Sequence, residues 1–141
     1  MQQRDILKDQ IEQLGRVLGK IIADFLGRKA QGEVGRALEE THQALQTALG
    51  MDPDELLNWS AVEMEAWVND RQWSSAQIDT LARYYYEAGA HRQDREGGAH
   101  NRFETARILL KLSEERSDTL TFDRMELKRL IDDALNNHTE L

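Results

Sequence analysis

A regular spacing of apolar residues constrains this chain more than any other feature of its sequence. In residues 5–26 the apolar side chains recur three or four positions apart, at Leu7, Ile11, Leu14, Leu18, Ile21 and Phe25. This spacing places them on one face of a helix. More apolar residues flank the stripe, so we expect a helix that is buried on more than one side, with Leu14 and Leu18 in the core. Gly15 and Gly19 predict a flat side that a second helix can approach closely.

The composition favours a helical, acidic, cysteine-free protein. The 141 residues suit one domain. A single proline and few β-branched residues favour helices over sheets. The net charge of −8 argues against nucleic acid as a partner, because binding to phosphate depends on excess Lys and Arg.

Without cysteine there is no disulfide and no thiolate ligand or nucleophile. Neither a signal peptide nor an apolar run of membrane-spanning length is visible, so we expect a cytoplasmic protein that does not bind membranes.

Helix start and stop signals divide the chain into four segments. Ser60 with Glu63, and Ser74 with Gln77, have the spacing of capping boxes at helix starts. The sequence therefore predicts an all-α, single-domain bundle of about six helices. The segments are a long N-terminal hairpin at about 5–50, a middle cap at about 52–73, a second hairpin at about 75–116 and a C-terminal helix at about 122–136.

Four further expectations concern particular residues. Gly27 is predicted to end the first helix. Residues 90–102 are predicted to form a mobile, protease-sensitive loop, because they contain adjacent glycines and many charges. The C-terminal helix is expected to turn Phe122 and Met125 inward with its other apolar residues. The three tryptophans of the middle cap are read either as packing against the long helices or as a patch for a partner: Trp59, Trp67 and Trp73.

The second hairpin resembles tetratricopeptide-repeat hairpins. Small and large residues match the first helix of that motif at Leu81, Ala82, Tyr85 and Gly89, and the second helix at Ala106 and Leu110. Gly32, Ala37 and Ala44 match the second-helix pattern in the front half of the chain. The proline that closes the motif is missing from both copies. DILKDQIEQL followed by GRALEETHQAL is also similar to a family of uncharacterised bacterial helical proteins that carry such hairpins.

The tetratricopeptide resemblance implies that a peptide or protein binds the inner face of the first helix of the hairpin. Carried over by position, that face would consist of Asp79, Arg83, Tyr86 and Glu87. This surface combines an aromatic ring, a guanidinium group and carboxylates, and Arg and Tyr are enriched among residues that dominate binding energy. The alternative is that the middle cap covers the same surface and makes it part of the core.

No pattern in the sequence predicts catalysis, a cofactor or a metal. Glu39 and His42 have the spacing used in di-iron bundles, but no second copy exists and they lie toward the polar side of their helix. His91 and His100 flank a glycine-containing loop that lacks a fixed set of ligands. We therefore expect a non-enzymatic protein-interaction module with no bound metal. The alternatives are a homodimer or larger homo-oligomer that packs through its first helix, and a metal-binding or enzymatic bundle.

Overall fold

The computed structural model of the chain describes residues 2–91 and 98–139, with side-chain surroundings given for residues 9–91 except position 11 and for 98–137. These residues form helices, turns and loops and no strand, so the predicted all-α single domain is confirmed. None of the described helices is long and apolar enough to cross a lipid bilayer. The elements are α1 (Gln2–Ala30), α2 (Val34–Leu49), the 3-10 helix η1 (Pro53–Asn58), α3 (Ala61–Asp70), α4 (Ser75–Ala90), α5 (Gly98–Arg116) and α6 (Phe122–Thr139).

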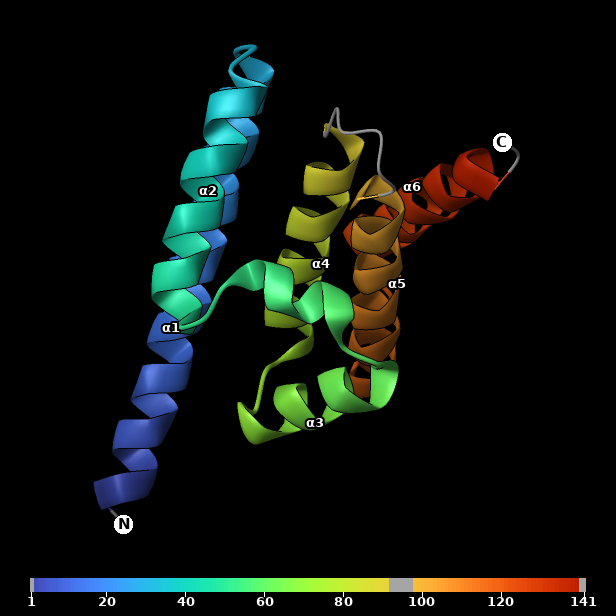
Figure 1. The fold of residues 1–141 in the computed structure, drawn as a ribbon. Helices are drawn as coiled ribbons and strands as arrows, with labels where there is room; N and C mark the ends of the chain where they lie inside the picture. The colour runs from blue at the N-terminus through green and yellow to red at the C-terminus, as the bar shows by residue number, and fades with distance from the viewer. Residues whose placement is uncertain (1, 92–97, 140–141) are drawn as a thin grey trace.

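Two helical hairpins make up most of the fold (Figure 1). In the first, α2 runs back along part of α1; in the second, α4 and α5 lie side by side. The segment η1–α3 connects the hairpins, with η1 packed on α2 and α5, and α3 packed on α5. α6 packs on α5 and α4. Since α4 also contacts α1, it is the helix through which the two hairpins and α6 meet.

The first helix ends later than the sequence predicted. It continues through Gly27, which was expected to end it, as far as Ala30. The left-handed residue is Gly32, with φ of 85°. The amide of Glu33 donates to the carbonyl of Arg28 at 3.1 Å, and the amide of Gly32 donates to that of Lys29 at 3.0 Å. This pair of bonds is the Schellman motif, so Gly32 ends the helix because it takes the positive φ at little cost.

The middle segment begins and ends at the predicted caps. Both capping boxes are formed, by Ser60 with Glu63 and by Ser74 with Gln77. The tryptophans form a row, with ring centroids 5.7 Å apart for the first pair and 5.0 Å for the second, and all three join the core: Trp59, Trp67 and Trp73. Only Trp73 is fully buried. The row is therefore part of the core, and α3, which contains Trp67, packs on α5.

The apolar core follows the predicted stripe in α1 but not the predicted face of α6. Leu18 is completely buried, whereas Leu14 is only half-buried. Phe122 and Met125 were expected to point inward and are instead 89% and 51% exposed. The buried face of α6 contains a charged residue, Arg124, together with Leu127, Ile131 and Leu135. A face that includes an arginine cannot be found by looking for apolar residues alone.

Helices α4 and α5 cross closely at Gly89. A Cβ atom at this position would lie 2.8 Å from a ring carbon of Phe103 and 3.1 Å from the backbone oxygen of Ala99. The second of these atoms belongs to the backbone, so it cannot move aside as a side chain would. The absence of a side chain at Gly89 thus sets how closely α5 approaches α4.

Two glycine-to-alanine variants should shift stability in opposite directions. Gly19 lies inside α1 with open space around it, so Gly19→Ala should raise the free energy of unfolding by up to about 1 kcal/mol through helix propensity. Gly89→Ala should lower it, because crowding Phe103 and Ala99 costs about 1–3 kcal/mol and outweighs the same gain in propensity. Urea unfolding of both variants measures the two signs. Equal stabilisation by both would show that α4 and α5 have room to separate.

Part of the range 90–102, which was predicted to be a loop, is helical. α4 ends at Ala90 and α5 already begins at Gly98, so the second half of the predicted loop is helical. Ala99 and Arg102 are buried there, the latter donating from Nη1 to the backbone oxygen of Gly98 at 3.0 Å. The predicted cleavage sites at positions 92 and 95 lie outside the described residues.

Candidate functional site

The first of the predicted binding residues, Asp79, connects three helices. Arg124 of α6 donates from Nε to both carboxylate oxygens at 3.2 Å and from Nη2 to Oδ2 at 3.0 Å. The hydroxyl of Ser113 on α5 donates to Oδ1. Arg124 also donates from Nη1 to the backbone oxygen of Thr119 at 2.8 Å, and its side chain is only 7% exposed. Asp79 therefore neutralises a buried guanidinium and joins α4 to α5 and α6.

Glu87, the last of the predicted binding residues, is completely buried in a cluster of basic side chains. Lys29 of α1 places Nζ 3.1 Å from Oε1 and 2.9 Å from Oε2. Arg83 donates from Nε to Oε1 at 3.0 Å, and His91, the C-cap of α4, places Nε2 3.2 Å from Oε2. One carboxylate thus has two permanently charged partners and an imidazole. This cluster joins the end of α1 to the end of α4.

Asp79, with its side chain 24% exposed, Arg83 and Tyr86 are the predicted binding residues that remain partly accessible. The side chain of Arg83 is 31% exposed although it pairs with Glu87. The ring of Tyr86 lies 5.8 Å from that of Phe103, and burial raises the pKa of its hydroxyl, with a further contribution from the charge of Glu87. The four residues therefore share one side of α4, but the carboxylates of Asp79 and Glu87 are already paired with Arg124 of α6 and Lys29 of α1.

A second polar cluster, which the sequence did not predict, lies between α2, η1, α4 and α5. His42 places Nε2 3.2 Å from Oδ1 of Asp52, and its Nδ1 lies 3.1 Å from the hydroxyl of Tyr84. Asp54 lies 3.9 Å from the same Nδ1 and accepts a hydrogen bond from Nη2 of Arg102 at 3.3 Å. The sequence placed His42 on a solvated face. No local pattern in the sequence shows that the chain at the start of η1 brings the carboxylates of Asp52 and Asp54 close to His42.

The ligand atoms of His42, Asp52 and Asp54 lie within 4.8 Å of one another, a spacing that could hold a metal ion. His42 and Asp54 border a hollow of about 430 Å³ that Glu39 also lines. Other groups already use these oxygens, however. Oδ1 of Asp52 caps η1 by accepting from the amide of Asp54 at 2.9 Å, and the guanidinium of Arg102 occupies Oδ1 of Asp54. A cation would have to compete with both, so the geometry favours a hydrogen-bonded structural cluster.

Metal content provides a direct test of this interpretation. We expect purified, untagged protein to contain no stoichiometric zinc, iron or manganese, and EDTA to leave the melting temperature unchanged, because Arg102 and the η1 cap hold the carboxylates. One metal ion per chain would contradict this expectation. Its loss in His42→Asn, but not in His100→Asn, would then place the ion in the cluster at His42.

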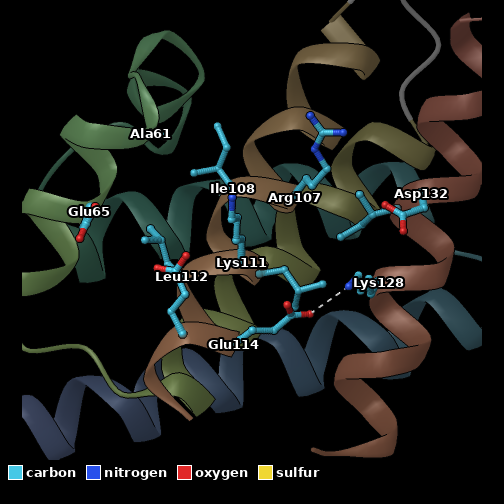
Figure 2. Close-up of a pocket in the computed structure, with 12 residues that line it drawn as sticks. Ala61, Glu65, Arg107, Ile108, Lys111, Leu112, Glu114, Lys128 and Asp132 are labelled. Carbon is cyan, nitrogen blue, oxygen red and sulfur yellow. Dashed lines mark ion pairs between the residues drawn. The ribbon is translucent and has the colours of Figure 1, made fainter.

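The larger of the two described hollows lies on the other side of the second hairpin, between α3, α5 and α6 (Figure 2). It has a volume of about 540 Å³ and is open to solvent. Figure 2 shows Ile108, Lys111 and Leu112 of α5 between Glu65, which comes from α3, and Asp132, which comes from α6. Apolar residues of three helices contribute to it: Ala61, Ile108, Leu110, Leu112 and Ile131.

Charged side chains surround the apolar part of this hollow. Lys128 of α6 lies 3.7 Å from Glu114 of α5, the ion pair drawn in Figure 2. Arg107 donates to Glu104, one turn back along α5, at 3.0 Å. The sequence singled out none of these residues for function, because they come from three separate segments and only the tertiary arrangement brings them together.

Comparisons with protein-family models, with curated proteins and with solved structures found no match to this chain. The resemblance of the second hairpin to tetratricopeptide repeats therefore remains a prediction from the sequence.

Proposed function

We propose that this protein is a non-enzymatic interaction module that binds a helical segment of another protein. The observation that carries the proposal is the open hollow between α3, α5 and α6, where the partly exposed Ile108 lies with Lys111 between Glu65 of α3 and Asp132 of α6. Binding sites of this kind combine an apolar surface with polar groups that fix orientation.

The dimensions of the hollow suit a helix. Its α5 residues run from Arg107 to Glu115, which corresponds to about 12 Å along the helix axis at 1.5 Å per residue. That length corresponds to about two turns of a bound helix, enough for apolar anchors at positions i, i+4 and i+7. Met125, which is 51% exposed, lies one turn before Lys128 on α6, so apolar surface is also available beside this edge.

The predicted surface on α4 supplies an alternative location for the same function. Asp79 and Glu87 hold helices together, so Arg83 and Tyr86 are the residues there whose side chains do not link α4 to α1 or α6. The resemblance to tetratricopeptide hairpins favours that side of α4, whereas the hollow favours α5. The two locations can be separated by experiment.

Site-specific photo-crosslinking in the native cell tests the proposal. A photoreactive amino acid is placed at Ile108 in the hollow, at Tyr86 on α4, and at Val17 on α1 as an exposed control. We expect one defined adduct from position 108 that is absent from position 17. An adduct from position 86 alone would move the binding surface to α4. Adducts from neither position would contradict the proposed function.

A further inference from the structure

The hollow between α3, α5 and α6 has an excess of unpaired acidic groups. Arg107 and Lys128 already have carboxylate partners on this protein. Among the described residues, three acidic side chains and one basic side chain of the lining have no ion pair: Glu65, Glu115, Asp132 and Lys111. A bound partner therefore meets more negative than positive charge that is free to interact.

The placement of these charges is as informative as their number. Glu65 lies on the α3 edge and Asp132 on the α6 edge, with Ile108 and Leu112 of α5 between them (Figure 2). A helix that turned its apolar side toward the partly exposed Ile108 would place the residues on both sides of its apolar stripe over the two acidic edges.

Resting on the proposed function, we infer that the occupant of the hollow is a basic amphipathic helix of a partner protein, with Lys or Arg on both sides of its apolar stripe. Charge complementarity between a partner and the edges of a site steers association and selects among partners. The net charge of −8 acts in the same direction at longer range. A second copy of this chain offers no free apolar stripe on its first helix, since Leu18 and Phe25 there are already buried in its own core.

The test uses two synthetic helical peptides with the same apolar stripe, one flanked by Lys and the other by Glu. Fluorescence anisotropy measures their binding to the full chain at several salt concentrations. We expect the Lys-flanked peptide to bind at least about tenfold more tightly in low salt, and the difference to shrink as salt screens the edges. Ile108→Gln should weaken both peptides, because it removes apolar contact without changing charge.

A charge-reversal pair isolates the two edges. Glu65→Lys with Asp132→Lys should reduce or reverse the preference for the Lys-flanked peptide. Asp9→Lys with Asp24→Lys changes the net charge equally at exposed positions of α1 and should leave the preference nearly intact. Equal effects of the two pairs would mean that only net charge matters and would overturn the inference.

The remaining outcomes separate the inference from the proposed function. Equal binding of both peptides, weakened by Ile108→Gln, would overturn the basic partner while leaving the interaction module standing. Binding of neither peptide above a scrambled control would overturn both. A dimeric mass by light scattering that returns to the monomer in Ile108→Gln would show that a second copy fills the hollow, and would also overturn the inference.

Discussion

Replacing Asp79 with alanine should destabilise the protein by about 3–5 kcal/mol, because it leaves the buried guanidinium of Arg124 without its carboxylate. The free energy of unfolding from urea titration measures the loss. Asp133→Ala removes a comparable pair, in which Asp133 accepts from Arg129 at 3.1 Å. The side chains of Asp133 and Arg129 are, however, both more than half exposed. That control should change stability by no more than about 1 kcal/mol.

The double variant Asp79→Ala with Arg124→Leu makes the test more specific. If the loss comes from an uncompensated buried charge, removing the charge as well should restore much of the stability. A double variant no more stable than Asp79→Ala would show that the loss arises elsewhere, for example from the hydrogen bond of Ser113. A loss in Asp79→Ala no greater than that in Asp133→Ala would contradict the conclusion that Asp79 holds α4 to α5 and α6.

Leu18→Ala should cost about 2–5 kcal/mol, because the side chain is completely buried and its removal leaves a cavity in the core. The neighbouring residue supplies a matched control. Val17 is 40% exposed, so Val17→Ala should change the free energy of unfolding by about 0.5 kcal/mol. Equal thermal shifts for the two variants would show that α1 is rotated relative to the described packing.

The positions of most helices could be predicted because their signals are local. The capping boxes at Ser60 and Ser74 depend on side chains three residues apart, and both are formed. The glycine at position 50 closes α2 in the left-handed conformation, which glycine adopts at little cost. The start of α5 at Gly98 was missed, because the prediction read its adjacent glycines as a break. The packing of Ala99 against α4 at Gly89 favours the helix more than the adjacent glycines disfavour it.

The candidate sites could not be predicted in the same way, because they depend on pairs far apart in the sequence. The partner of Asp79 is 45 residues away, and Glu87 meets Lys29 across 58 residues. A buried acid on a helix face looks the same in sequence as a solvated one until its cation is placed beside it. For this reason the sequence singled out the side of α4 with Asp79 and Glu87 as a binding surface but could not show that the fold itself uses these carboxylates.

The crossing of α4 and α5 sets the orientation of the proposed binding surface. Leu112 follows Phe103 by nine residues, which is about 180° around α5 at 3.6 residues per turn. The side of α5 that rests on Gly89 is therefore opposite the side that contributes Leu112 to the hollow. Gly89 therefore affects the shape of a surface that it does not touch. A larger residue at position 89 would push α5 toward α3 and α6 and so narrow the hollow between these three helices.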